Sequence, residues 1–133
     1  MVSEKKLVAD IEDYFQDMRY MTATEIPLFE NRIDVVAHPD NLSEIVAVEA
    51  KVNRWFRALQ QAIIYRICAD KVYIAISNHH VQCVDKGLLK RFGVGLLEVD
   101  GRVRESLSPN PSKYITHQAA REAVMNSLSK DRG

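Results

Sequence analysis

Two spacings of hydrophobic residues alternate along the chain. Leu7, Ile11 and Phe15 recur at helical spacing after Ser3, a residue type that caps helix N-termini, so the sequence predicts a first helix here. Three short segments rich in β-branched residues follow, at residues 21–29, 32–38 and 44–52. They predict an antiparallel meander whose first strand, which contains Pro27, lies at an edge or carries a bulge.

The rest of the chain alternates between helical and strand patterns. Asn53 can cap a helix over about 54–69, and further helices are predicted at 81–91 and within 113–128. The predicted strands are residues 71–77, 94–99 and 102–107, the last two joined at an Asp-Gly turn. The order α-β-β-β-α-β-α-β-β-α predicts a mixed sheet flanked by helices, in the α/β or α+β class.

Length and composition fit a single globular unit. The chain has 133 residues, of which 47% are hydrophobic, and no apolar run approaches the roughly 18 residues of a membrane span. Acidic residues occupy the N-terminal stretch where a signal peptide would be apolar, so we expect a cytoplasmic protein without membrane contact. We expect the main domain over 1–108, and a loop and helix over 109–133 that packs on the core or forms a homodimer contact.

The net charge of zero conceals an uneven distribution. Residues 1–50 hold four Lys or Arg and eleven Asp or Glu, a net charge of −7, and residues 51–133 carry the compensating +7. Such asymmetry between halves is typical of chains with charged partners. Overall neutrality therefore does not exclude a nucleic acid.

Three charged residues interrupt otherwise apolar predicted strands. Glu49 and Lys51 point to the same face, and Asp34 can reach that face if the two strands pair. Two neighbouring carboxylates repel each other, and a divalent cation such as Mg²⁺ or Mn²⁺ relieves the repulsion by accepting oxygen ligands from both. A lysine beside them can orient or deprotonate a water. The set suits attack of a metal-activated water on a phosphodiester.

The helix predicted after these strands has two distinct faces. Its apolar arc is predicted to pack on the sheet and contains Trp55, Phe56, Leu59, Ala62 and Ile63. Gln61 and Tyr65 are four residues apart and lie together on another face, where they could hold the lysine. Arg66 falls within the apolar arc, and we expect it to form an ion pair.

The ordered set resembles a known enzyme superfamily. Asp34, then Glu49-Ala50-Lys51, then a Q-x-x-x-Y segment ending at Tyr65 resemble the PD-(D/E)XK nucleases, in their RecB-like and Holliday-junction-resolvase-like branch. The resemblance implies a restriction-endonuclease-like fold with an αβββαβ core. It also implies that Asp34 and Glu49 bind the metal, that Lys51 serves the attacking water, and that Gln61 and Tyr65 support the site and the DNA backbone.

Two details of this resemblance concern neighbouring residues. Ile33 stands where the superfamily nominally has proline before the Asp, a departure that the superfamily tolerates. Glu4 begins a Glu-x-x-Leu segment like that on the first helix of archaeal Holliday-junction resolvases, which makes it a further candidate metal ligand. Glu12 competes with it for that role.

The sequence thus predicts a Mg²⁺- or Mn²⁺-dependent DNA nuclease of repair, recombination or defence, with RNA left open as substrate. The expected metal ligands are Asp34, Glu49 and the Ala50 carbonyl oxygen, with Glu4 as the further candidate. Phosphate contacts are expected from Arg54, Arg57, Lys86, Lys90 and Arg91. Two alternatives stay open: a non-catalytic nuclease-like binding subunit targeted by a partner protein, and a small α/β protein whose Glu-x-Lys is a surface ion pair.

Overall fold

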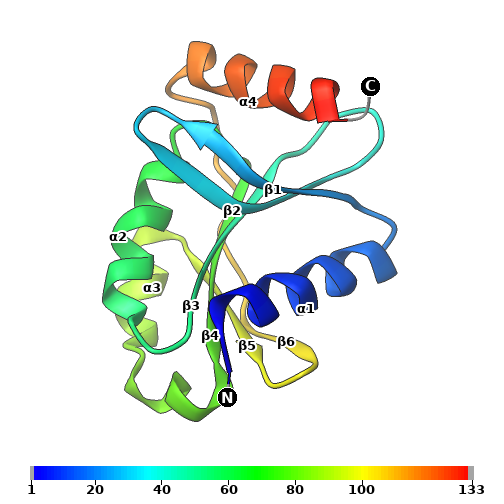
Figure 1. Cartoon of the computed structure of the whole chain (residues 1–133). Helices are drawn as coiled ribbons and strands as arrows, with labels where there is room; N and C mark the ends of the chain where they lie inside the picture. The colour runs from blue at the N-terminus through cyan, green and yellow to red at the C-terminus, as the bar shows by residue number, and fades with distance from the viewer. Residues whose placement is uncertain (1, 132–133) are drawn as a thin grey trace.

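The computed structural model describes residues 2–131 (Figure 1). The helices in this part of the chain are α1 (Glu4–Asp17), α2 (Trp55–Tyr65), α3 (Lys86–Phe92) and α4 (Gln118–Asp131), with a 3₁₀ helix η1 (Asn78–Cys83). The strands are β1 (Met21–Leu28), β2 (Asn31–His38), β3 (Val46–Lys51), β4 (Lys71–Ser77), β5 (Gly95–Val99) and β6 (Val103–Leu107). The predicted α-β-β-β-α-β-α-β-β-α order is confirmed.

The six strands form one sheet in the order of the chain, β1-β2-β3-β4-β5-β6. The pairs β1–β2 and β2–β3 are antiparallel, as the meander prediction requires, and β1 is the edge strand that Pro27 indicated. The pairs β3–β4 and β4–β5 are parallel, while β5 and β6 form the hairpin that turns at Gly101, whose φ is +86°. The carboxyl ends of β3, β4 and β5 therefore lie at one edge of the sheet.

Helices cover both faces of this sheet (Figure 1). On one face α1 buries Leu7, Ile11 and Phe15 against β2 to β5, and its N-cap Ser3 accepts a hydrogen bond from the Lys6 N–H as predicted. On the other face α2 and α4 contribute to a larger core, and its members from these two helices are Ala58, Leu59, Ala62, Tyr65, Ala120, Val124 and Leu128. Burial of each large apolar side chain contributes about 1.5–3 kcal/mol.

The tail segment is attached to this second core. Ser112 N donates to the Asp70 carbonyl at 2.8 Å, and His117 N donates to the Ile67 carbonyl at 3.1 Å. Arg121 then donates to the Cys68 carbonyl and pairs with the Asp70 carboxylate at 3.0 Å. These contacts hold α4 against the β1 side of the sheet. No helix in the described part of the chain is both long and apolar enough to cross a membrane.

Four local predictions are wrong. Arg54 is the N-cap of α2 in place of Asn53, and it makes no side-chain cap hydrogen bond. The helix predicted over 81–91 is divided into η1 and α3, because Val84 is extended and the Asp85 side chain starts a new helix by accepting from the Leu88 N–H. Phe56, a member of the predicted arc, is 52% exposed, because the buried face of α2 is formed by Ala58, Leu59, Ala62 and Tyr65, of which Leu59 and Ala62 belong to that arc. Arg66 forms no ion pair in the described chain and donates to the Gly93 and Asn110 carbonyls.

Candidate active site

The site lies where β2 separates from β3. The two strands pair from Ala37↔Val46 to Val35↔Val48, and the ladder stops just before Asp34 and Glu49. In place of a ladder bond, the Ala50 N–H donates to Asp34 Oδ2 at 2.9 Å. Because the N–H and C=O of one residue lie on the same edge of an extended strand, the Ala50 carbonyl also faces the opened edge.

An irregularity at Asp34 accounts for this separation. Glu25, at the corresponding position of β1, has a φ of +53°, and the β1–β2 ladder skips this pair. Ile33 packs on the α2 side of the sheet and Val35 on the α1 side, although simple alternation would give both the same face. The β1–β2 hairpin therefore turns away from the rest of the sheet, as Figure 1 shows, and Asp34 lies at the turning point.

Glu49 is held from α2 by a buried tyrosine. The Tyr65 hydroxyl donates to Glu49 Oε1 at 2.5 Å and lies 3.1 Å from the carbonyl oxygen of Arg32 on the separated strand. Glu49 is 5% exposed and Tyr65 is 1% exposed. Burial, followed by the neighbouring Glu49 charge, raises the pKa of Tyr65 far above its usual range, so the phenol stays protonated and remains a donor.

Burial disfavours the ionised form of both carboxyl groups, and the Asp34 charge adds to this effect at Glu49. Burial and then the Asp34 charge raise the pKa of Glu49 to about 7, although the Tyr65 hydrogen bond and the Lys51 charge act in the opposite direction. Burial also raises the pKa of Asp34, partly offset by the Ala50 N–H and by Lys51. Near neutral pH the pair therefore tends to retain a proton. Paired hard oxygen donors of this kind fit Mg²⁺ or Mn²⁺, which relieves the repulsion that keeps the proton bound.

Lys51 and Glu4 meet at the entrance to the carboxyl pair. Lys51 Nζ lies 3.5 Å from Glu4 Oε1, at the N-terminus of α1. Glu4 and Asp34 also line a hollow of about 590 Å³ between α1 and β1, together with Glu12 and Glu25. No group of three or more His, Cys, Asp or Glu side chains in the described residues is arranged to hold a metal ion. The site is therefore a carboxyl pair with Glu4 beyond it, and the role of Glu4 stays a prediction.

Gln61 lies one turn before Tyr65 on α2, as its spacing predicts. Its side-chain oxygen is buried and has no hydrogen-bond partner within the described chain. A buried acceptor without a donor costs about 1–3 kcal/mol, and such atoms occur at sites that receive a partner from outside.

The predicted phosphate contacts all lie on the α2 side of the molecule. Arg54 directly precedes α2 and Arg57 is in its first turn, and both are exposed. Lys86, Lys90 and Arg91 are exposed on α3. These five exposed side chains, called below the cationic surface of α2 and α3, lie outside the hollow beside α1, and their contact with nucleic acid stays a prediction.

The fold is a mixed α/β fold with a six-stranded mixed sheet and flanking helices, which is the predicted class. No protein-family model and no curated protein matches the sequence. Among solved structures, a protein of unknown function from Silicibacter pomeroyi superposes with a TM-score of 0.77 at 18% identity, over 99% of this chain and 87% of that one. It shares the fold of this chain.

Two further structures are more distant. A repair endonuclease from Pyrococcus abyssi has a TM-score of 0.48 at 16% identity, over 76% of this chain and 49% of that one. SfsA from Pyrococcus furiosus, whose structure was determined in complex with Ca²⁺, has a TM-score of 0.46 at 12% identity, over 80% of this chain and 64% of that one.

Proposed function

We propose that the protein is a Mg²⁺- or Mn²⁺-dependent nuclease of the PD-(D/E)XK superfamily that hydrolyses phosphodiester bonds in DNA. The observation that carries the proposal is the carboxyl pair of Asp34 and Glu49 at the strand separation, with Lys51 two residues beyond Glu49. A surface Glu-x-Lys ion pair does not account for this arrangement, because Glu49 is 5% exposed and is hydrogen-bonded to Tyr65.

Asp34, Glu49 and the Ala50 carbonyl oxygen would hold the cation. When bound, a divalent cation lowers the pKa of a bound water and neutralises charge on the phosphate oxygens. Tyr65 fixes one Glu49 oxygen, and the Ala50 N–H fixes one Asp34 oxygen, so each carboxylate keeps its second oxygen for a ligand. Glu4 is a further candidate ligand, because it lines the same hollow as Asp34.

Lys51 would position the attacking water and stabilise negative charge that develops on the phosphate. Its side chain is 24% exposed, and it lies between the carboxyl pair and the carboxylate of Glu4. The Glu4 carboxylate is the ion-pair partner of this ammonium group. Gln61 would support this group from α2, where its buried oxygen is an available acceptor.

Double-stranded or branched DNA would approach over the cationic surface of α2 and α3. Contacts from Arg54, Arg57 and the α3 residues to phosphates give binding without base reading. Within the described chain we identify no element that would enter a groove to read bases. Specificity would therefore come from the shape of the substrate.

The proposal is tested by incubating linear, circular, single-stranded and branched DNA with the pure protein and Mg²⁺ or Mn²⁺. We expect cleavage by the wild type, and a loss of at least about a hundredfold in rate for Glu49→Gln and Lys51→Ala. Lys130→Ala, at an exposed position of α4, is the matched control and should cleave at the wild-type rate. Circular dichroism verifies that each variant is folded.

Unchanged cleavage by Lys51→Ala would contradict the proposed mechanism, in which Lys51 positions the attacking water. DNA binding by the wild type without cleavage of any substrate would instead leave the protein as a nucleic-acid-binding subunit.

A further inference from the structure

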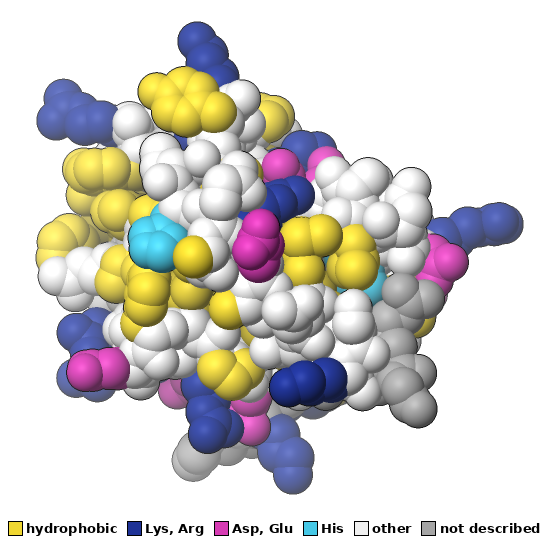
Figure 2. Space-filling model, turned by 90° about the horizontal axis from the view of Figure 1, so that it is seen from above, with side chains coloured by type: hydrophobic (Ala, Val, Ile, Leu, Met, Phe, Trp, Pro, Cys, Tyr) yellow, Lys and Arg dark blue, Asp and Glu magenta, His cyan; other side chains and the backbone are white. Residues whose placement is uncertain are grey.

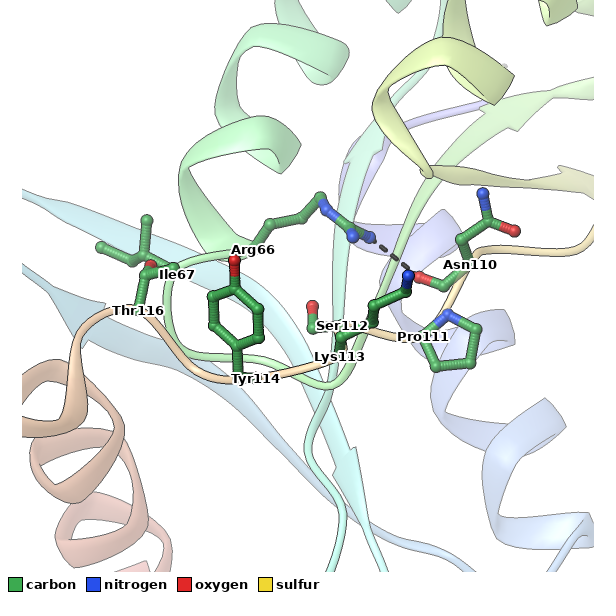
Figure 3. A pocket seen from close by; sticks show the side chains of 8 residues that line it. All are labelled: Arg66, Ile67, Asn110, Pro111, Ser112, Lys113, Tyr114 and Thr116. Atoms are coloured by element: carbon green, nitrogen blue, oxygen red, sulfur yellow. Dashed lines mark hydrogen bonds between the residues drawn. The ribbon is translucent and has the colours of Figure 1, made fainter.

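A second hollow lies away from the carboxyl pair, where the end of α2 meets the segment before α4. It has a volume of about 640 Å³, and its lining includes Arg66, Ile67, Lys113, Tyr114 and Thr116 (Figure 3). Figure 3 shows the Tyr114 ring beside Ile67 and Thr116, with the Arg66 guanidinium bound to Asn110 on the other side. None of the proposed metal or water-positioning residues lines this hollow.

One exposed aromatic ring, Tyr114, lines this hollow, and a second, Phe29, lies near the segment that follows it. Tyr114 is 76% exposed and Phe29, at the tip of the β1–β2 hairpin, is 63% exposed. The Phe29 ring contacts the His117 ring edge to face at 5.5 Å, and His117 follows Thr116 directly. Figure 2 looks onto the end of the molecule that carries α4, and shows hydrophobic side chains gathered around a histidine on one side of that face.

Phe29 adopts an unfavourable backbone conformation. Leu28 pairs with Asn31, so Phe29 and Glu30 form a two-residue hairpin loop, and the φ of Phe29 is +55°. Positions with a positive φ favour Asn, Asp or Gly, because the Cβ atom of most other residues clashes with the neighbouring backbone. An exposed phenylalanine gains little packing in compensation. Conformations of this kind cluster at functional sites, which points to a ligand for the ring.

The charge of this region favours an anionic ligand. Residues 106–121 contain no Asp or Glu, but they include Lys113 and Arg121. Arg121 is paired with Asp70. The cations that line the hollow within the described chain are Lys113 and Arg66, whose guanidinium donates to the neutral carbonyls of Gly93 and Asn110. Among the described residues, no carboxylate lines it. Exposed aromatic rings beside cations are the combination that binds single-stranded nucleic acid, since bases stack on the rings and phosphates meet the cations.

The hollow is connected to the proposed active site by two elements. Strand β2 runs from the hairpin tip to Asp34, and five residues of strand span about 16 Å. The second element is the end of α2, where Tyr65, which donates to Glu49, directly precedes Arg66, a residue that lines the hollow. At about 3.4 Å per nucleotide along one strand, this separation corresponds to about five nucleotides, or fewer in a stretched strand.

We propose that the hollow and the rings of Phe29 and Tyr114 bind single-stranded DNA. The further statement that this strand is a flank of the DNA substrate, about five nucleotides from the bond that is cut, rests on the proposed nuclease function. The substrate class is then duplex or branched DNA that carries a single-stranded flank.

Binding is tested without cleavage, by fluorescence anisotropy of a labelled oligo(dT) of about 15 nucleotides in EDTA. We expect Tyr114→Ala and Phe29→Asn each to weaken binding about fivefold or more, since each removes a stacking ring. Asn tolerates the positive φ at position 29, so the hairpin is kept. Tyr114→Phe should bind like the wild type. Phe56→Ala, which removes a comparably exposed ring at the opposite end of α2, is the matched control.

Equal affinity of the wild type, Tyr114→Ala and Phe29→Asn for oligo(dT) would overturn the proposal, as would no binding by the wild type. A wild-type oligomer in light scattering that these variants dissociate, with oligo(dT) binding unchanged, would show a protein interface instead and also overturn it. In the cleavage assay, the wild type should prefer a flanked duplex over a blunt one, and both variants should lose the preference. Ring-dependent oligo(dT) binding without any cleavage would refute the nuclease function alone and support the single-strand site.

Discussion

The charge of one buried carboxyl group governs the candidate site. Glu49 is surrounded by the Asp34 carboxyl group and the Tyr65 hydroxyl, and burial with the Asp34 charge raises its pKa from an ordinary value of 4.5 to about 7. The folded protein therefore holds a proton that the unfolded chain has already released between these pH values. Ionisation of Glu49 therefore lowers the stability of the metal-free folded protein. A bound cation would favour the same ionisation.

Glu49→Gln should stabilise the metal-free protein at alkaline pH. The pKa is raised in the folded state, so wild-type stability in EDTA falls as the pH rises from about 4.5 through about 7, and Gln removes this loss. We expect the variant to be more stable by about 1–3 kcal/mol at pH 8, and the advantage to disappear below pH 4.5. Urea unfolding across this range measures it, with Glu30→Gln at the exposed hairpin tip as control. A constant difference at all pH values would contradict the raised pKa.

Individual site residues could be predicted from the sequence because each rests on a short periodicity. Alternation within a strand identified Glu49 and Lys51, and a spacing of one helical turn identified Gln61 and Tyr65. The Asp34 contact with the Ala50 N–H and the Glu4 contact with Lys51 could not be predicted, because they depend on where β2 separates from β3 and on where the N-terminus of α1 lies. The only local signal was Pro27 in the predicted edge strand.

At the scale of elements, Arg66 joins three parts of the fold. It ends α2, and its guanidinium donates to the carbonyl of Gly93, the C-cap of α3, and to that of Asn110 in the segment before α4. The sequence pattern led us to expect an ion pair for Arg66. Helical periodicity predicts which face of the helix Arg66 occupies, but it does not predict which group Arg66 contacts. A planar donor group can satisfy two main-chain carbonyls that end separate elements, and these carbonyls are supplied by distant parts of the chain.

Arg66→Ala should destabilise the protein by about 2 kcal/mol, since it removes two hydrogen bonds from a charged donor. Gln60→Ala, at an exposed position on the same helix, should change stability by less than about 0.5 kcal/mol. Denaturant unfolding measures both. Equal stability of the two variants would mean that water replaces the Arg66 contacts without loss.

The order of elements could be predicted because it follows from local hydrophobic patterns. The buried face of a helix could not always be predicted, because it also depends on tertiary contacts. Apolar runs such as 71–77 coincide with β4, because a strand buried on both faces needs apolar residues at nearly every position. Phe56 was assigned to the core from its hydrophobicity, yet α2 buries Tyr65 instead, because Glu49 satisfies the tyrosine hydroxyl. That exchange depends on a tertiary partner which the helix pattern does not contain.

At the scale of the whole molecule, opposite charges occupy different surfaces. The hollow beside α1 is lined by four carboxylates and one lysine (Glu4, Glu12, Glu25, Asp34 and Lys5), whereas the exposed charges proposed to bind phosphate lie on α2 and α3. A polyanion would be repelled at the hollow and attracted to the helices unless a cation neutralises the carboxylates. Net neutrality thus limits indiscriminate binding and leaves room for a local contact with DNA.

Removal of these cations should change the salt dependence of DNA binding. Arg54→Ala and Arg57→Ala should each lower the slope of log K against log salt by about 0.9, the value for one lost phosphate contact. Arg19→Asn, beyond the end of α1, is a control that removes the same charge elsewhere. Anisotropy titrations of duplex DNA in EDTA at several salt concentrations provide the slopes. Equal slopes for all four proteins would place DNA on another surface.

The claim that Asp34 and Glu49 hold a divalent cation is tested most directly by calorimetric titration of the metal-free protein with Mn²⁺. We predict one bound Mn²⁺ per chain near pH 6.5, with release of the Glu49 proton seen as a dependence of the heat on the buffer, and no binding by folded Asp34→Asn. Absence of Mn²⁺ binding by the folded wild type, or equal binding by Asp34→Asn, would contradict the account.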